Sequence, residues 1–577
     1  MAGHRSRASR LVAAVAMALA ACALTGLGAA AAASTPVAVW GPAHTIVEAP
    51  GLGSFLDAAE LTCYGVGDCL AAGADSTDPY PATQQAVATE TNGVWGKANL
   101  ISSLTKLALG KQDQIEAVSC ASPGNCTAGG WYFPAFGEGG SWSLPFLVTE
   151  RKGTWGQAQD PPDLAKLNVG ADGAVTSVTC TGAGDCVAGG FYAATSQRNG
   201  KAVVYGAFVI DQRNGIWGKP ITLTSSTYLE ASEVSSVACT SPGNCVAAGF
   251  TDRAFTARET NYAWHSPTFI GAMSTITLLS CAAGGDCVAA GSAVQSSCHY
   301  IPVTCTAAYV TEKNEAWGAP RTMLDAAKAK TRWSALTTLS CGSRGNCVAG
   351  GSTYTYNSNI GDAAFQEALL QEKNGSWSNR PIPGLAALNT GGEDAVTSAS
   401  CTAAGDCEVG GYYTNSHGRQ YGFLFTEANG TWGKLAPVDV GPVGEISCFS
   451  PFSCAALVSP GVGTQDETNS AVMDKEAVEA TKAFLSLSTG RLTYGHEQAE
   501  LVSARVTAKV GDPEGAVVVA SGSTTLCVIG LINGSGSCAL APKALPAGTH
   551  TVTGYYVGES FFKASSSASK TIVVVKA

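Results

Sequence analysis

The chain has 577 residues, of which only 14% are charged, and its formal net charge is −10. This acidic balance disfavours binding to nucleic acid and to anionic membranes, because both repel a negative surface. The length allows more than one domain, and the 68 glycines are typical of many short strands joined by tight turns.

The N-terminal segment, residues 1–33, has the features of a secretory signal peptide. Three arginines precede an apolar run from Leu11 to Leu27, and a tract of small residues ends at Ala33. We expect cleavage after Ala33 and a secreted, extracellular protein that can associate with the cell surface. A lipoprotein anchored through Cys22 is the second interpretation, and the apolar residues after that cysteine argue against it. No other run is long and apolar enough to span a bilayer.

The 20 cysteines after Cys22 are an even number in a chain expected in an oxidising compartment, so we predict ten local disulfides. Eight of the pairs enclose five residues each. A metal site would need four ligands at one point, whereas these pairs lie far apart and the chain has only 7 histidines. We therefore expect no metal and no other cofactor. The predicted pairs are Cys63 with Cys69, Cys120 with Cys126, Cys180 with Cys186, Cys239 with Cys245, Cys281 with Cys287, Cys298 with Cys305, Cys341 with Cys347, Cys401 with Cys407, Cys448 with Cys454, and Cys527 with Cys538.

Each five-residue cysteine pair belongs to a longer repeat. The third unit contains, in order, VTSVTC, TGAGD, CVAGGFY, YGAFVID, RNG and IWGKP. β-Branched residues alternate along it, and Gly-Asp and Asn-Gly mark hairpin turns, so the unit predicts a four-stranded antiparallel meander. One meander cannot bury both of its faces. Units stacked around an axis can, which is the arrangement of a β-propeller.

The tryptophans predict how such a ring closes. Trp40 precedes the first cysteine pair, and no tryptophan follows the pair that ends at Cys454. A strand around Val37 to Trp40 would therefore complete the last sheet. We predict an all-β fold with an eight-bladed β-propeller over residues 34–478; seven blades are the alternative if the divergent last unit packs outside the ring.

The repeat resembles known propeller families. A Gly-Gly pair, a strand and a tryptophan follow one another as in the kelch repeat, and the turns at Glu90, Glu372 and Glu427 resemble the sialidase Asp-box, although they lack its Ser and Asp and are one residue shorter. The combined pattern is most similar to the cysteine-paired repeats of actinobacterial secreted propeller proteins. This resemblance spans residues 35–478 and implies the fold, with little about activity. The Gly-Gly pairs are Gly129-Gly130, Gly189-Gly190, Gly350-Gly351 and Gly410-Gly411.

The tail, residues 479–577, contains no tryptophan and several strand-like segments separated by turns. It resembles a bacterial Ig-like domain of group 3, which implies a small β-sandwich that acts as a spacer or stalk. We expect Cys527 and Cys538 to bridge a hairpin across Asn533-Gly534.

In a β-propeller the first strand of each blade lines the central channel, where catalytic groups are expected. Residue types that would support catalysis are missing from these strands. The first strands of the units contain no Arg, Lys or His, whereas a sialidase-like site needs an arginine cluster. The chain also has no nucleophile elbow, phosphate loop or zinc-protease helix. An Asp or Asn stands before the second cysteine in seven of the eight five-residue pairs, and a Glu stands five residues before most tryptophans. Because both recur at fixed positions, we expect turn and packing roles for them.

The loops between the second and third strands are rich in aromatic residues, which suit stacking on sugars or contact with a protein. Packing of the outer strands is the competing explanation. The predicted ligand-binding residues are Trp131, Tyr132, Phe136, Trp142, Tyr192, Tyr354, Tyr356, Tyr412 and Tyr413.

We therefore expect a secreted, monomeric, non-enzymatic binding or adhesion protein that recognises an extracellular glycan or a cell-surface protein. The alternative is a glycan hydrolase or lyase. It would use acidic residues near the start of the first strands, provided that two of them converge in one cleft. These residues are Glu116, Glu233, Glu393 and Asp394.

Overall fold

The computed structural model shows an all-β protein. Its described residues contain two short α-helices, α2 (Ser102–Leu107) and α3 (Leu385–Leu388), and none of their helices is long and apolar enough to cross a membrane. The predicted signal peptide, Cys22 and the pair of Cys298 and Cys305 lie outside the described residues. The structure describes residues 38–46, 56–75, 84–109, 112–134, 143–195, 203–225, 231–282, 285–293, 306–323, 333–357, 362–459, 470–477, 480–508, 513, 515–522, 524–558 and 562–576.

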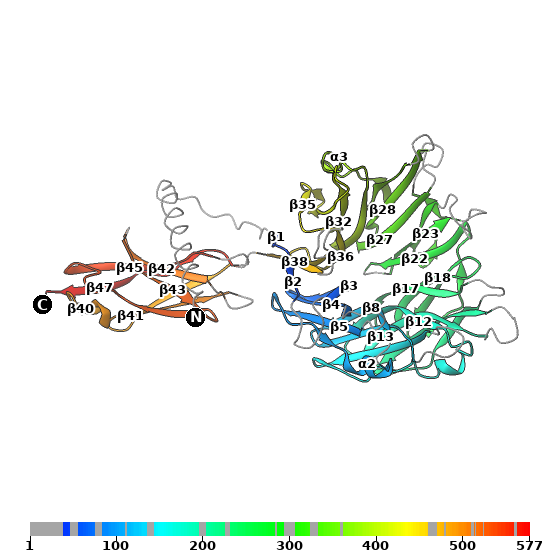
Figure 1. Cartoon of the computed structure of the whole chain (residues 1–577), viewed down its shortest axis with the longest axis horizontal. Helices are drawn as coiled ribbons and strands as arrows, with labels where there is room; N and C mark the ends of the chain where they lie inside the picture. Colours follow the sequence, from blue (N-terminus) through cyan, green and yellow to red (C-terminus); the bar gives the residue numbers. More distant parts are fainter. Residues whose placement is uncertain are drawn as a thin grey trace. The chain divides into compact units, whose positions relative to one another are not determined.

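Eight antiparallel sheets follow one another along the chain and are arranged radially (Figure 1). In sheets 1 to 7, four consecutive strands pair in chain order. Sheets 1 to 4 are β3 (Leu56–Gly65), β4 (Asp68–Asp75), β5 (Gln84–Thr91) and β6 (Val94–Trp95); β8 (Asp113–Ser122), β9 (Asn125–Tyr132), β10 (Leu144–Arg151) and β11 (Thr154–Trp155); β12 (Gly173–Gly182), β13 (Asp185–Ala193), β14 (Tyr205–Arg213) and β15 (Ile216–Trp217); and β17 (Glu233–Ser241), β18 (Asn244–Phe250), β19 (Ala254–Thr260) and β20 (Ala263–Trp264).

Sheets 5 to 7 continue the same order. They are β22 (Met273–Cys281), β23 (Cys287–Ala293), β24 (Ala307–Lys313) and β25 (Ala316–Trp317); β27 (Trp333–Ser343), β28 (Asn346–Asn357), β29 (Asp362–Lys373) and β30 (Ser376–Asn379); and β31 (Asp394–Ala403), β32 (Asp406–Thr414), β33 (Gln420–Ala428) and β34 (Thr431–Trp432). In five sheets a further short strand pairs with the third strand. These strands are β7 (Asn99–Leu100), β16 (Ile221–Ser225), β21 (Thr268–Phe269), β26 (Arg321–Thr322) and β35 (Ala436–Val438).

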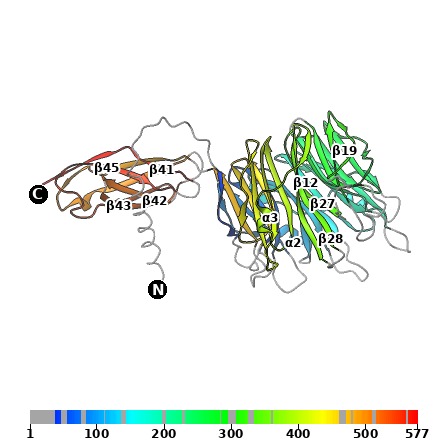
Figure 2. The same ribbon diagram turned by 90° about the horizontal axis from the view of Figure 1, so that it is seen from above.

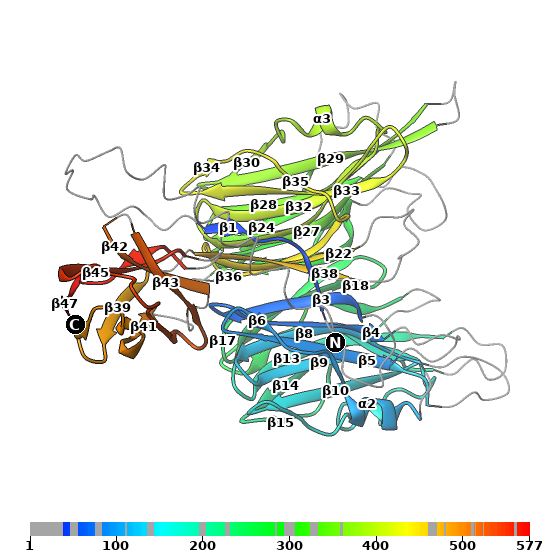
Figure 3. The same ribbon diagram turned by 60° about the vertical axis from the view of Figure 1, so that its left-hand side comes forward.

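Sheet 8 combines both ends of this region. Its strands pair in the order β1-β38-β37-β36, and β2 also pairs with β38. Trp40 lies opposite Lys475, so the N-terminal strand takes the outer position in this sheet, as the tryptophan pattern predicts (Figure 3). These strands are β36 (Val443–Ser450), β37 (Ser453–Val458), β38 (Ala471–Ala477), β1 (Ala38–Trp40) and β2 (His44–Thr45).

Each five-residue cysteine pair forms a disulfide that links the first and second strands of its sheet across their hairpin. In sheet 3, for example, Cys180 lies directly opposite Cys186. Nine of the ten predicted pairs fall within the described residues, and all nine are bonded. Each short disulfide therefore holds one local hairpin and links no distant parts of the chain.

The Gly-Gly pairs exist because two backbones approach closely at this point. A Cβ on Gly189 would lie 2.4 Å from Val234 of the next sheet, and a Cβ on Gly190 would lie 2.0 Å from the carbonyl oxygen of Ala174 in the same sheet. The first strand bulges between Val175 and Ser177, which brings that carbonyl forward. Gly189 thus allows neighbouring sheets to pack, and Gly190 allows the first two strands of one sheet to approach closely.

Neighbouring first strands are also joined by a repeated hydrogen bond. The backbone N–H of the first cysteine in one sheet donates a hydrogen bond to a hydroxyl of the preceding sheet. The hydroxyl belongs to the residue just before that sheet's own first cysteine. Cys180 donates in this way to Ser119 at 3.0 Å, and Cys401 to Ser340 at 2.9 Å. Cys63 of sheet 1 makes the same bond to Ser447 of sheet 8 at 2.9 Å. The first and last sheets therefore meet through the contact that joins internal neighbours.

The C-terminal domain is a two-layer β-sandwich, drawn in orange and red in Figures 1 and 2. The disulfide between Cys527 and Cys538 links β43 in one layer to β44 in the other. As predicted, the bridge spans the hairpin turn at Asn533-Gly534, which is closed by pairing of Ile532 with Ser535. Beyond this turn the two strands belong to different layers. One layer is β39 (Lys482–Leu487), β41 (Leu501–Thr507) and β44 (Ser535–Ala539), and the other is β40 (Arg491–Thr493), β47 (Lys570–Val575), β45 (Gly548–Tyr556), β42 (Gly515–Ser521), β43 (Thr524–Leu531) and β46 (Ser565–Ser566).

Candidate functional site

One aromatic position recurs at the loop end of the second strands, opposite the cysteine turns. The residue that follows the second glycine of the Gly-Gly or Ala-Gly pair is half-buried and aromatic in four sheets. Each pairs with a residue near the start of the neighbouring first strand, as Trp131 pairs with Gln114 and Phe250 with Glu233. These aromatic residues are Trp131, Phe191, Phe250 and Tyr412.

Trp131 is oriented by a carboxylate. Its indole Nε1 donates to Glu116 Oε1 at 2.9 Å, and its ring lies 4.9 Å from that of Phe133. Glu116 occupies the bulge of β8 between Ile115 and Ala117. In sheets 3, 6 and 7 the bulge holds a threonine that bonds backbone carbonyls, so Glu116 departs from the repeat.

Carboxyl groups from the first strands of several sheets influence one another at this end. Burial, followed by the charge of Glu116, raises the pKa of Glu60 to about 8. Burial and then the charge of Glu60 raise the pKa of Glu445, and burial raises that of Glu233, to which Glu116 adds. Acids of sheets 8, 1, 2 and 4 therefore form one electrostatic group, called here the channel acids. In the described part of the chain, no three His, Cys, Asp or Glu residues are placed to hold a metal ion.

Three of the predicted ligand-binding tyrosines are core residues. Tyr132, Tyr192 and Tyr413 are only 4%, 5% and 7% exposed. Tyr132 donates to Asp160 Oδ1 at 2.7 Å, and Tyr192 shares a 2.8 Å hydrogen bond with the hydroxyl of Thr222. They cannot present a ring to a ligand, because alternate residues of a strand point to opposite faces and this face packs against neighbouring elements.

The other predicted ligand-binding residues divide into two groups. Trp131, Tyr354 and Tyr412 remain half-buried, and Tyr354 packs 5.3 Å from Phe365. Phe136, Trp142 and the side chain of Tyr356 lie outside the described residues.

The predicted acidic residues also separate. Asp394 is 3% exposed and accepts hydrogen bonds from the backbone of Glu367 and the amide of Asn389, both at 2.7 Å. These bonds hold the start of β31 to Glu367 of β29 and to Asn389. Glu116 and Glu233 lie within electrostatic reach of each other, whereas Glu393 lies near Tyr412.

The recurrent turn residues are structural. Asp68 accepts the backbone N–H of Asn92 at 2.9 Å, and Asp406 accepts that of Asn429 at 2.8 Å. In six sheets the Asp or Asn before the second cysteine thus accepts the backbone N–H of the asparagine that begins the turn between the third and fourth strands.

Phe191, Phe250, Glu60 and Glu445 were not singled out from the sequence. The two phenylalanines follow a Gly-Gly or Ala-Gly pair, so their register with Trp131 was visible in the repeat. The two glutamates lie one position after a first-strand bulge, and a bulge shifts the face on which a side chain emerges. No residue pattern in the chain marked those bulges.

Comparison with known proteins identifies the C-terminal domain. The family of bacterial Ig-like domains (group 3) matches residues 485–575. No curated protein matches the sequence.

Solved structures that resemble the chain include Sqt1 of Chaetomium thermophilum, at 10% identity and a TM-score of 0.37, covering 64% of this chain and 96% of that one. An α-L-arabinanase of Penicillium chrysogenum complexed with arabinobiose has 9% identity and a TM-score of 0.32, covering 77% and 99%. An ulvan lyase of a polysaccharide lyase family has 10% identity and a TM-score of 0.36, covering 75% and 93%. Because these TM-scores are low, no function is inferred from the three structures. The family match shows that the chain contains a C-terminal bacterial Ig-like domain of group 3.

Proposed function

We propose that this protein is secreted after removal of residues 1–33 and binds an extracellular glycan without modifying it. Residues 34–478 form a closed eight-bladed propeller in this proposal, and residues 479–577 act as a spacer. The nine disulfides among the described residues suit an oxidising compartment outside the cytoplasm.

The observation that carries the proposal is the shared register of the half-buried aromatics on sheets 2, 3 and 4, next to the channel acids. Trp131, Phe191 and Phe250 come from consecutive sheets, and Glu116 is already held by Trp131. Sugar rings stack on aromatic faces while carboxylates accept bonds from their hydroxyl groups. A neutral polysaccharide suits this site better than an acidic one, because Glu116 and Glu233 repel anions.

The test uses residues 34–577 on a glycan array, followed by titration of the best ligand. Trp131→Ala and Phe250→Ala are each expected to weaken binding about tenfold or more, because each removes one stacking face. The matched control is Phe449→Ala, which removes a 49% exposed aromatic beside the cysteine turn at the other end of a first strand. Full affinity in both site variants, with circular dichroism unchanged, would reject this site.

A glycan-active enzyme is the alternative, and the raised pKa of Glu60 is the observation that favours it. A carboxyl group that stays protonated near neutral pH beside a second carboxylate can act as a general acid. Incubation with a polysaccharide panel, read out as new reducing ends or unsaturated sugars, distinguishes the two functions. Activity that is lost in Glu60→Gln while binding persists would establish the enzyme; a binding protein releases no product.

A further inference from the structure

Two junctions between neighbouring sheets share one contact at the third strand. In six sheets this strand carries a buried glutamate near its end. At these two junctions the residue before the glutamate reaches the corresponding glutamate of the next sheet. Arg258 forms an ion pair with Glu312 at the junction of sheets 4 and 5. We call the residue before the glutamate the junction residue.

The junction of sheets 6 and 7 uses an amide for the same purpose. Gln371 donates through its Nε2 to Glu427 at 2.7 Å and accepts through its Oε1 the indole Nε1 of Trp432 at 3.1 Å. One carboxamide therefore satisfies both a buried acceptor and a buried donor. The space left beside it is about 20 Å³.

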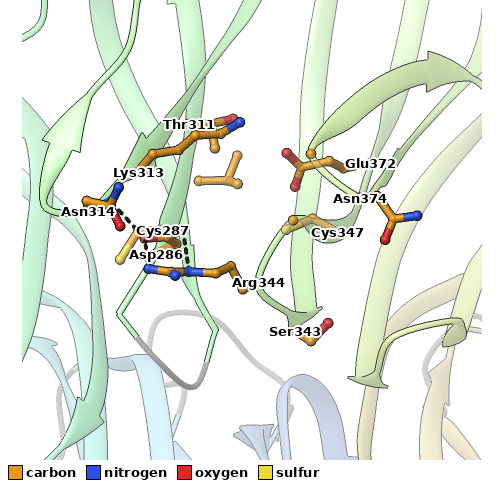
Figure 4. A pocket seen from close by; sticks show the side chains of 13 residues that line it. Asp286, Cys287, Thr311, Lys313, Asn314, Ser343, Arg344, Cys347, Glu372 and Asn374 are labelled. Atoms are coloured by element: carbon orange, nitrogen blue, oxygen red, sulfur yellow. Dashed lines mark hydrogen bonds and ion pairs between the residues drawn. The ribbon is translucent and has the colours of Figure 1, made fainter.

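At the junction of sheets 5 and 6 the junction residue is Thr311, whose side chain is too short to reach the glutamate of the next sheet, Glu372. A pocket of about 280 Å³ opens there, and in Figure 4 the carboxylate of Glu372 lies across it from Thr311. Glu372 is 2% exposed, and among the described residues neither of its oxygens has a hydrogen-bond partner at normal distance. It corresponds to Glu427, so the buried acceptor is present and the carboxamide that would satisfy it is missing. Trp377 lies close enough to Glu372 to lower the pKa of that carboxyl group, but it does not line the pocket.

The other charged groups of the pocket are compatible with a neutral ligand. Arg344 is engaged by Asp286, with its Nε 2.6 Å from Oδ2, and Lys313 opposes the charge of Glu372 without forming an ion pair with it in the described structure. The two cations and two carboxylates balance. The junction of sheets 6 and 7 also has a lysine, Lys373, after its junction residue, and it uses the neutral amide.

We infer that the pocket between sheets 5 and 6 binds a small ligand through an amide group, whose N–H donates to the buried carboxylate of Glu372. Two sources share this chemistry: the primary amide of a glutamine-like molecule and the acetamido group of an N-acetylated sugar. This site is independent of the aromatic site at the loop end, because it lies beside the cysteine and Asn-Gly turns.

Saturation-transfer NMR on residues 34–577 tests the inference with L-glutamine and N-acetylglucosamine as probes, and L-glutamate and D-glucose as their controls without an amide. At least one amide probe is expected to bind and its control is not; the responding probe identifies the source. If neither amide probe shows transfer at 10 mM, a concentration of the order at which weak fragments bind, the inference is overturned.

Variants locate the binding. Thr311→Gln recreates the junction of sheets 6 and 7 inside the chain, so it is expected to abolish transfer and to raise the melting temperature by about 2 °C. Glu372→Gln is expected to weaken binding about tenfold. The matched control is Thr149→Gln, at the equivalent junction of sheets 2 and 3, where Gln212 replaces the glutamate and already bonds Thr149 at 3.1 Å. Binding that survives in Thr311→Gln, or that is lost in Thr149→Gln, would contradict the assignment.

Discussion

Buried glutamates behave differently in the two regions of this molecule. In the Ig-like domain Glu500 is fully buried, and its two oxygens accept bonds from the backbone and hydroxyl groups of residues 488–490, including 2.7 Å from Gly490 and 2.8 Å from Thr489. In the eight sheets Glu259 is 1% exposed, and neither of its oxygens has a hydrogen-bond partner among the described residues. A buried glutamate carboxylate thus accepts several hydrogen bonds in the Ig-like domain and none in this part of the eight sheets.

The pKa directions follow from this contrast. Burial acts to raise the pKa of Glu500, but the hydrogen bonds from Ser488, Thr489 and Gly490 together outweigh it and lower the pKa below its usual value. Burial, followed by the charge of Asp211, raises the pKa of Glu259 to about 7. Burial by itself therefore does not decide the charge of a glutamate; the supply of donors does.

The largest effect is expected where a buried charge of the eight sheets does have a partner. Lys475 takes the glutamate position in sheet 8 and pairs with the buried Glu408 of sheet 7, which also accepts the indole N–H of Trp40 at 3.3 Å. Lys475→Met leaves Glu408 unpaired and is expected to cost about 3–5 kcal/mol of unfolding free energy. Urea denaturation measures it.

The double variant Lys475→Met with Glu408→Gln serves as the control for that loss. It removes both charges and is expected to recover most of the stability. If the double variant is no more stable than Lys475→Met, the loss comes from packing and the ion pair is not its cause.

A somewhat smaller effect is expected from Glu500→Gln in the Ig-like domain. The amide nitrogen cannot accept a bond, so part of the donor set at residues 488–490 is left unpaired, at a cost of about 2–3 kcal/mol. The unfolding transition of the C-terminal domain should move while that of the sheets does not. Lys570→Gln, an exposed site in the same domain, provides the control and should leave both transitions in place.

Gly190→Ala tests the close approach of the first two strands within one of the eight sheets. The added methyl group would meet the Ala174 carbonyl, so we expect a loss of about 1–3 kcal/mol in differential scanning calorimetry. Gly271→Ala is the matched control, because no atom lies within 4 Å of its added Cβ. Equal stability of the two variants would show that the backbones can separate without cost.

The smallest effect is the response to pH, which should differ in sign between the regions. The pKa values of Glu259 and Asp113 are raised to about 7, so the stability they contribute is present at low pH and is lost as the pH rises through 7. The eight sheets should therefore melt higher at pH 5.5 than at pH 8. The Ig-like domain should be insensitive in that window and lose stability only as the pH falls below about 4.5, through the lowered pKa of Glu500.

Glu259→Gln sharpens this last comparison. It removes one group that titrates near neutrality, so the pH dependence of the sheet transition should become shallower while that of the Ig-like domain is unchanged. If the melting temperature of the sheets depends on pH as steeply as before, or more steeply, carboxyl groups other than Glu259 cause the pH dependence.

Much of the fold could be predicted from the chain because its information is local and repeated. The cysteine spacing specified the hairpins, and the displaced Trp40 predicted a last sheet completed from the N-terminus, which is where β1 pairs. The candidate site was predicted less well. Tyr132 and Tyr192 were proposed as ligand-binding residues because they lie near loops, yet they are buried. The residue types near a loop do not reveal which face of a strand is covered by an adjacent sheet.

The sequence by itself determined the all-β repeat, the cysteine pairs and the position of the Ig-like domain, because turns and alternation depend on residues close together in the chain. Only the tertiary structure decided which carboxylates have partners. Glu372 and Glu427 stand in the same sequence pattern, but one faces Thr311 and the other Gln371, each about 60 residues earlier and in a different sheet. That difference follows from packing between sheets, where the length of one side chain either fills a space or leaves it open.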